Sequence, residues 1–497
     1  MTTISPSESR ESESSDAAET VDVLIVGAGL SGIGAAHHLQ SKLPGKSYAI
    51  LESRGAIGGT WDLFRYPGIR SDSDMYTLGY NFRPWTGDKS IADGKDIREY
   101  IEDTARDGGI DKHIRFHHRV VKASWSTATS TWTVVAERSD TGATVTFEAS
   151  FLMCCSGYYD YAKGFTPEFE GVDDFRGTVV HPQLWPEDLD YSGKKVVVIG
   201  SGATAITLAP NLARDAEHVT LLQRSPSYIM SLPSKDPVAL ALRKYLPSKA
   251  AYGITRLKNA VTAIGMYVLC QRYPNFMKKQ IRKLQEKWLP EGYDLDTHFT
   301  PKYNPWDQRL CLVPDNDLFR CIRKGEVELV TDHIDRFTGD GIRLRSGKHL
   351  DADIVVTATG LNLVAFGHVD LEVDGKTVDL TETMAYKGMM LTDVPNFAFV
   401  VGYTNASWTL KADLVCDYVS RLLGHMDESG YREVRLKRDQ SVGEEPFLDF
   451  AAGYVLRSVD TFPKQGSEAP WRLRMNYFRD LPVLRFGSLV DDNMSFR

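Results

Sequence analysis

The sequence predicts an α/β protein with two parallel sheets, each opened by a strand, a glycine-rich turn and a helix. Residues 21–26 form a short, mostly apolar run of the kind found in buried parallel strands. The turn that follows has the spacing Gly-x-Gly-x-x-Gly, and a helix is expected from there through Leu39. Residues 195–200 repeat this pattern with the turn Gly-Ser-Gly. Two such units in a chain of 497 residues predict two Rossmann-like dinucleotide-binding domains.

The order of apolar runs and turn residues divides the chain into five parts. Residues 1–20 are rich in Ser, Glu and Thr and carry few large apolar side chains, which predicts a disordered tail. The other parts are the first part of one nucleotide-binding domain (21–158), a Pro- and Gly-rich linker (159–190), the second nucleotide-binding domain (191–345) with a helical, basic insert at about 235–305, and a return to the first domain with a C-terminal segment (346–497).

Further elements are expected inside these parts. Short β-rich runs between residues 120 and 151 predict an antiparallel meander inserted in the first domain. A helix is expected at 411–423. Buried strands are expected at 48–52, 151–157, 327–330, 354–360 and 395–401.

Composition and charge disfavour several classes of protein. The net charge of −8 argues against a nucleic-acid partner, because phosphate binding needs a basic surface. The six cysteines show neither a C-x-x-C pair nor a zinc-ligand spacing, so we expect no bound metal and a reducing, cytoplasmic location. The N-terminus lacks a signal-peptide pattern, and no apolar run reaches the ~18 residues of a spanning helix.

The first glycine-rich turn has the features of a pyrophosphate-binding loop. Gly27 permits the tight turn, Gly29 lets the backbone approach a pyrophosphate, and Gly32 allows the helix to pack closely on the strand. Glu52 ends the next strand, 20 residues after the last glycine, where a carboxylate would accept hydrogen bonds from ribose hydroxyls. This context makes a structural glycine-rich turn without a ligand the weaker interpretation.

The second turn differs at the end of its next strand, where Arg224 stands in place of an acid. An arginine there suits a ribose 2′-phosphate, which favours NADPH over NADH. The alternative interpretation of Arg224 is a solvated surface side chain. The predicted contacts to this second nucleotide are Gly200, Gly202, Ala203, Thr204, Arg224 and Ser225.

Two longer motifs carry a family resemblance. The first, in the linker, is Phe175-x-Gly177-x-x-x-His181-x-x-x-Trp185-Pro, and the second is Gly59-x-Trp61-x4-Tyr-Pro-Gly-x3-Asp72. Together with both glycine turns they resemble the Baeyer–Villiger monooxygenases, a family of class B flavoprotein monooxygenases. Within that family the sequence is most similar to the mycobacterial ethionamide-activating, FAD-containing enzymes, on residues 58–74, 303–309 and 402–411.

The resemblance implies an activity. NADPH would reduce FAD, O2 would form a peroxide at flavin C4a, and this would convert ketones to esters or lactones and also oxidise thioethers or thioamides. An alternative is a flavin-dependent S- or N-oxygenase with little ketone activity; the Trp-Pro of the linker motif favours the ketone reaction. A disulfide reductase is disfavoured, because no cysteine pair follows the first glycine turn. A flavin-binding sensor without turnover is a further alternative, which the intact motifs argue against.

The resemblance also implies residue roles. Arg309 matches the active-site arginine of the family, and Asp72 matches the carboxylate that pairs with it. Gly59, Thr60, Trp61 and Asp72 would contact FAD. The linker motif (Phe175, Gly177, His181 and Trp185) is expected to couple domain movement to catalysis, not to act on substrate. Gln308 departs from the lysine of many members, so NADPH preference would depend more on Arg224. Residues 403–409 are expected to form a wall near the flavin.

The helical insert carries an unusual charge pattern. Between Arg243 and Lys287 many cations stand with Glu286 as the only acid, beside the apolar run 263–269. A basic amphipathic helix can lie on an anionic membrane surface, which makes weak peripheral membrane contact one interpretation. The favoured interpretation is an insert that packs on the second domain and presents a solvated basic face.

Overall fold

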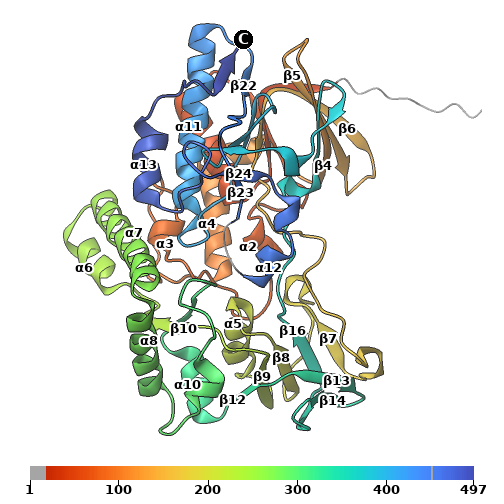
Figure 1. Cartoon of the computed structure of the whole chain (residues 1–497), viewed down its shortest axis with the longest axis vertical. Helices are drawn as coiled ribbons and strands as arrows, with labels where there is room; N and C mark the ends of the chain where they lie inside the picture. Colours follow the sequence, from red (N-terminus) through yellow and green to blue (C-terminus); the bar gives the residue numbers. More distant parts are fainter. Residues whose placement is uncertain (1–17, 449–451) are drawn as a thin grey trace, which may run out of the picture.

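The computed structural model describes residues 18–448 and 452–497 as two lobes (Figure 1). The upper lobe holds the N-terminal and C-terminal parts of the chain, and the lower lobe holds the middle of the chain. Residues 1–17, most of the predicted tail, lie outside the described residues. Strand β1 (Glu19–Val26) begins inside the predicted tail 1–20.

A nine-stranded sheet organises the upper lobe, in the order β18-β17-β4-β5-β6-β1-β2-β3, with β21 also paired to β6. Its parallel part joins β1, β2 (Tyr48–Leu51), β3 (Ile114–Arg115) and the ends of β6 (Thr144–Cys154) and β21 (Phe397–Phe399). The second half of β1, residues 23–26, is entirely apolar because both of its faces are covered. Val23 and Ile25 belong to the core that includes helices α1 (Leu30–Lys42) and α11 (Trp408–Ser429). Leu24 and Val26 belong to the core on the meander side.

The predicted meander is present as β4 (His118–Ser126), β5 (Thr131–Arg138) and β6, which pair antiparallel. The expected strand at 151–157 is the end of β6 and not a separate element. Strand β6 therefore pairs antiparallel with β5 of the meander near its start, and in parallel with β1 and β21 toward its end. Strands β17 (Asp370–Val373) and β18 (Lys376–Thr377) extend the meander.

The lower lobe contains a five-stranded parallel sheet in the order β12-β9-β8-β16-β7. These strands are β7 (Thr178–Val180), β8 (Lys195–Ile199), β9 (His218–Gln223), β12 (Val327–Thr331) and β16 (Ile354–Thr357). Strand β16 pairs with β8, so the second domain extends past the predicted boundary at residue 345. Strand β7 lies inside the predicted linker and pairs with β16 at the sheet edge.

The predicted helical insert forms four helices, α6 (Pro237–Tyr245), α7 (Ser248–Arg272), α8 (Pro274–Trp288) and α9 (Leu295–Phe299). It contacts both lobes instead of the second domain alone. On α7, the Arg256 guanidinium donates to the Tyr76 and Gly79 carbonyl oxygens at 2.9 and 2.6 Å, in the upper lobe. On α8, Gln285 donates to the Ile229 carbonyl at 3.0 Å, in the lower lobe.

The remaining elements complete the two lobes. The other helices are α1 (Leu30–Lys42), α2 (Thr60–Leu63), α3 (Met75–Leu78), α4 (Gly94–Asp107), α5 (Ala203–Leu212), α10 (Asp317–Lys324), α11 (Trp408–Ser429), α12 (Gly453–Leu456) and α13 (Tyr477–Phe486). The other strands are β10 (Ile229–Leu232), β11 (Cys311–Pro314), β13 (Ile334–Thr338), β14 (Gly341–Leu344), β15 (His349–Asp351), β19 (Ala385–Tyr386), β20 (Met390–Leu391), β22 (Val434–Leu436), β23 (Glu444–Pro446), β24 (Lys464–Gly466) and β25 (Met494–Phe496). Helix α1 ends at Lys42 and not at the predicted Leu39. Helix α11 begins before and ends after the predicted range 411–423. In the described part of the chain, no helix is long and apolar enough to cross a bilayer.

Candidate active site

A cavity of about 1280 Å³ is lined by residues of both lobes. It reaches both glycine-rich turns and the acid and arginine predicted to act together. Of the residues predicted to contact the two nucleotides, all line it except Gly32: Gly27, Gly29, Glu52, Gly59, Thr60, Trp61, Asp72, Gly200, Gly202, Ala203, Thr204, Arg224 and Ser225. The cavity reaches one glycine turn in each lobe, as binding of two dinucleotides would require.

The first glycine turn is closed tightly enough that side chains are excluded. Gly27 has φ +101°, and a Cβ there would lie 2.8 Å from the Cys155 carbonyl oxygen. A Cβ at Gly32 would lie 1.8 Å from the Gly27 carbonyl oxygen, so the helix can approach the strand only with glycine. Helix α1 has no side-chain cap and no acid in its first turn. Its first N–H groups and positive dipole end remain available to an anion, as pyrophosphate binding requires.

Glu52 is fixed at the cavity wall by backbone donors. One carboxylate oxygen accepts from the Ala28 N–H at 2.7 Å, and the other accepts from the Arg54 N–H at 2.9 Å. Burial raises the pKa of Glu52, against the lowering effect of these hydrogen bonds. The acid therefore ties the end of β2 to the glycine turn, and it lies where a ribose would meet both.

A cluster around Asp62 holds the loop that carries Gly59, Thr60 and Trp61. The Asp62 carboxylate is 3% exposed and pairs with Arg54 at 2.7 Å, Arg65 at 2.6 Å and Arg98 at 3.5 Å. Three cations on one buried acid offset the cost of its desolvation and fix the loop on the first glycine turn. This cluster was not predictable from the sequence, because its members are spread over residues 54–98 without a motif.

The second glycine turn repeats the geometry of the first. Gly200 has φ +145°, and a Cβ there would lie 2.3 Å from the Ala358 carbonyl oxygen. Helix α5 begins after Gly202, again with no side-chain cap and no acid in its first turn. Arg224 follows β9 and is exposed at the cavity. Its position suits a phosphate bound at this turn.

Asp72 and Arg309, 237 residues apart, meet inside the cavity. The Arg309 guanidinium donates to the Asp72 carboxylate at 2.7 Å. The 34% exposure of the Arg309 side chain comes from the cavity that it lines. Asp72 is the main cause of an Arg309 pKa well above the ordinary value, so the guanidinium stays charged.

Three tyrosines around this ion pair were not predicted. Tyr158, Tyr159 and Tyr454 line the cavity, and each contributes to raising the pKa of Arg309. Tyr158 and Tyr159 follow the carboxyl end of β6, where ligands of parallel sheets bind. Their position after a predicted strand could therefore have identified them as site residues. No motif in the sequence around Tyr454, on α12, predicts that this residue lies at the site. Gln308 lines the cavity next to Arg309 and adds no charge.

The linker motif lies beside the cavity. His181 accepts from the Gln183 N–H through Nδ1 at 3.2 Å, so its Nε2–H donates to the Gly360 carbonyl at 3.1 Å. Burial lowers the pKa of His181, which keeps the ring neutral. A Cβ at Gly177 would lie 2.2 Å from the Asp353 carbonyl oxygen, so glycine is required there. These contacts fit a positioning role for His181.

Two aromatic side chains of the motif pack against the lower lobe. Phe175 is buried, with its ring centroid 5.9 Å from that of Phe337. Trp185 is partly buried and lies 6.4 Å from the ring of Tyr191. Both anchor the linker to the second domain.

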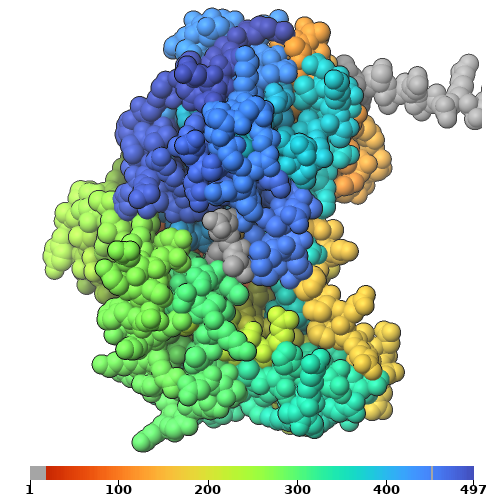
Figure 2. All heavy atoms as spheres, viewed as in Figure 1, coloured from red at the N-terminus to blue at the C-terminus, as the bar shows by residue number. Residues whose placement is uncertain are grey.

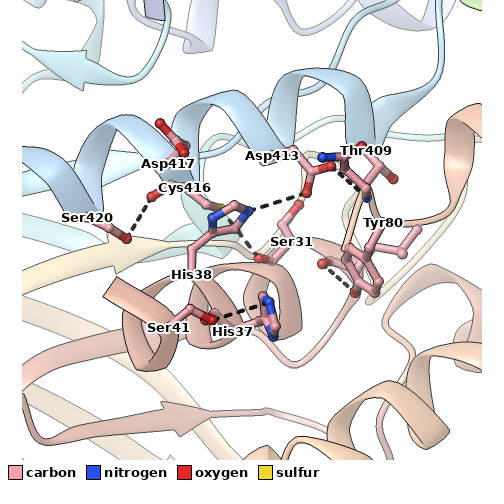
Figure 3. Close-up of polar contacts among 12 residues, drawn as sticks. Ser31, His37, His38, Ser41, Tyr80, Thr409, Asp413, Cys416, Asp417 and Ser420 are labelled. Atoms are coloured by element: carbon pink, nitrogen blue, oxygen red, sulfur yellow. Dashed lines mark hydrogen bonds and ion pairs between the residues drawn. The ribbon is translucent and has the colours of Figure 1, made fainter. Parts of the chain in front are cut away.

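Helix α11 packs on helix α1, which follows the first glycine turn (Figure 3). The Trp408 indole donates to Ser31 Oγ at 2.8 Å, and the His38 ring lies 3.6 Å from the Asp413 carboxylate. Tyr403, Ala406 and Trp408 line the cavity, within the segment 403–409 expected to form a wall. Within residues 18–448 and 452–497, no group of three His, Cys, Asp or Glu side chains could hold a metal ion.

Known proteins match the chain over most of its length. The profile "Flavin-binding monooxygenase-like" matches residues 89–399, and "NAD(P)-binding Rossmann-like domain" matches residues 25–85. The FAD-containing monooxygenase EthA of Mycobacterium tuberculosis is 58% identical over 480 residues, which cover 96% of this chain and 98% of that protein. The probable FAD-binding monooxygenase AlmA of Acinetobacter sp is 47% identical, with 96% of each chain covered.

Solved structures agree on the fold. An oxidized steroid monooxygenase bound to NADP matches with a TM-score of 0.75 and 23% identity, covering 96% of this chain and 99% of that one. A cyclohexanone-bound cyclohexanone monooxygenase matches with a TM-score of 0.70 and 22% identity, covering 85% and 90%. The predicted fold, enzyme class and family resemblance are confirmed. The chain belongs to the flavin-binding monooxygenase-like family.

Proposed function

We propose that this protein is an FAD- and NADPH-dependent Baeyer–Villiger monooxygenase that converts ketones to esters or lactones and also oxidises thioethers or thioamides. The observation that carries the proposal is the Arg309–Asp72 ion pair in a cavity that both glycine turns line. In the overall reaction a ketone, O2, NADPH and a proton give an ester, NADP⁺ and water.

FAD would occupy the first turn. Its pyrophosphate would meet the N–H groups at the start of α1, and its ribose would meet Glu52. The loop of Gly59, Thr60 and Trp61 would cover it from the other side. When bound and reduced, this cofactor supplies one atom of O2 to the substrate. The name of the FAD-containing relative at 58% identity supports the assignment.

NADPH would occupy the second turn. The start of α5 offers its N–H groups to the pyrophosphate, and Arg224 and Ser225 lie where the ribose 2′-phosphate would be held. The NADP named in the solved steroid monooxygenase supports a nucleotide of this kind.

The chain's own groups would act mainly through electrostatics. The charged guanidinium of Arg309 would stabilise negative charge that develops beside the flavin, and Asp72 would hold it in place. Asp72 bonds only one of the guanidinium nitrogens and Tyr454 interacts with the same side chain, so N–H groups of Arg309 that face the cavity would remain for ligands. The tyrosines around the pair would shield it from bulk water.

A flavin-dependent S- or N-oxygenase with little ketone activity is the competing proposal. Both reactions use the same cavity, so only products separate them. The FAD-loaded protein would receive NADPH and O2 with a linear ketone, a cyclic ketone, a phenyl ketone or a thioether, followed by mass spectrometry. An ester or lactone supports the Baeyer–Villiger reaction. A sulfoxide as the sole product would transfer the assignment to the competing proposal.

A further inference from the structure

Helices α6 to α8 carry a continuous segment without acids. Residues 237–285 contain no Asp or Glu, although the whole chain has a net charge of −8. Several cations of these helices are exposed: Arg243, Lys244, Lys249, Arg272, Lys279 and Lys283. This segment therefore carries a net positive charge within an acidic chain, and it projects at the left edge of the molecule (Figure 2).

The outer face of α7 is apolar. Ile254, Leu257, Val261 and Val268 are 49%, 57%, 51% and 49% exposed. Together with the half-buried Ile264 they follow a spacing of 3, 4, 3 and 4 residues, which aligns them on one face of the helix. We name these five residues the α7 stripe. Arg272 continues the same spacing at the end of the helix.

The opposite face of α7 already has its partners. Tyr252 donates to the Tyr80 carbonyl at 3.0 Å, and Arg256 pairs with Asp413 at 3.3 Å. Asn259 donates to the Asp74 carboxylate at 2.8 Å. The helix is anchored to the upper lobe by these side chains, so the α7 stripe is not needed for its packing.

Exposed aromatic side chains flank the α7 stripe at both ends. Tyr245 precedes α7 and is 84% exposed, and Tyr273 and Phe276 follow at the turn into α8 with 57% and 55% exposure. More than half of the large exposed apolar side chains in the described parts of the chain fall within residues 238–284. An apolar surface bordered by cations and aromatic rings has the composition of a membrane-interface segment.

We infer that the α7 stripe and the exposed cations of α6 to α8 bind the surface of an anionic lipid bilayer. Apolar side chains of this kind enter the headgroup boundary, and the cations meet the lipid phosphates. A second copy of the chain fits less well, because a symmetric contact through this face would bring cations of both copies together. The acidic remainder of the protein would be repelled by the same membrane, so only this face would approach it.

Vesicle co-sedimentation of the FAD-loaded full chain tests the inference. The expected result is binding to phosphatidylcholine vesicles that contain phosphatidylglycerol, weaker binding at high salt, and little binding to phosphatidylcholine alone. The Leu257→Glu/Val261→Glu variant should bind at least tenfold more weakly. Phe486→Glu/Val490→Glu is the matched control, since both side chains are exposed but lie outside the insert.

A second pair of variants tests the cations. Lys279→Ala/Lys283→Ala should weaken binding by roughly 25-fold, at about fivefold for each cation near an anionic surface. Lys112→Ala/Lys376→Ala, which removes two exposed lysines elsewhere, should leave it unchanged. Circular dichroism and NADPH oxidation in solution verify that each variant is folded.

Three outcomes would overturn the inference. The first is wild-type protein that stays in the supernatant with anionic vesicles. The second is an equal loss in the control variants. The third is a wild-type dimer in sedimentation equilibrium that the stripe variant converts to monomer, because a second copy would then cover the stripe. None of these depends on the substrate, so failure here leaves the proposed oxygenase activity untouched.

Discussion

Arg309 lies in the cavity with one carboxylate, Asp72, at 2.7 Å and tyrosine side chains around it. A cation held in this way needs no reorganisation when negative charge appears next to it, which is the condition for strong electrostatic stabilisation. Arg224 has a different setting. It is exposed at the rim of the second glycine turn, so its contribution would be to ligand binding and not to the reaction.

We expect Arg309→Ala to lower oxygenated product by about 10²–10³-fold, as removal of a stabilising donor does. Arg309→Lys, which keeps a charge but loses the planar fork, should recover part of the activity. Steady-state product formation measures both. Near-wild-type product from Arg309→Ala would remove the assigned role.

We expect Arg224→Ala to raise the KM for NADPH by roughly tenfold or more, because charge-assisted hydrogen bonds to the phosphate are lost. The KM for NADH should change little. Arg214→Ala, at an exposed position on the same domain, is the control. An equal rise of the KM for NADPH and for NADH would mean that Arg224 does not bind the 2′-phosphate.

The protonation of His37, on α1, predicts a pH dependence of stability. Its ring stacks on Phe82 at 3.5 Å, and burial, followed by the charge of His38, lowers its pKa from 6.5 to about 4. The unfolded chain therefore binds more protons between these values. The stabilisation by neutral His37 is complete above pH 6.5 and is lost as the pH falls toward about 4.

The melting temperature should accordingly fall between pH 6.5 and about 4, and His37→Gln should reduce that fall. His218→Gln, at a half-exposed edge of β9, serves as the control. An unchanged pH profile in His37→Gln would contradict the assignment.

At the scale of elements, the glycine turns are the parts that local sequence determined most completely. Strand, turn and helix follow each other within a few residues, and the steric reason for each glycine is local. The length of β6, the edge strand β7 and the domain boundary beside β16 were predicted less well. Their positions depend on pairing partners far away in the chain, which a single sequence does not reveal.

We expect Gly27→Ala to lower the FAD content of the purified protein, because a Cβ at φ +101° would lie 2.8 Å from the Cys155 carbonyl. Gly45→Ala is the matched control, since a Cβ there has no neighbour within 4 Å. The ratio of flavin to protein absorbance gives the result. Equal FAD content in both variants would contradict a cofactor at this turn.

At the scale of the whole molecule, several contacts join parts that the sequence treats as separate. Arg70, before α3, pairs with Asp317 of α10 at 3.0 Å, and Arg256 ties α7 to the upper lobe. His181 links the linker to Gly360 at the end of the lower sheet. The sequence predicted two domains, but it could not predict these contacts, nor that one cavity would be lined by both.

We propose that one atom of O2 is inserted into a ketone in this cavity. The most direct measurement supplies isotopically labelled O2, NADPH and a ketone to the FAD-loaded protein and analyses the product by mass spectrometry. We expect an ester or lactone with one labelled oxygen from the wild type and little from Arg309→Ala. Unlabelled ketone with hydrogen peroxide as the only product, across linear, cyclic and phenyl ketones, would contradict it.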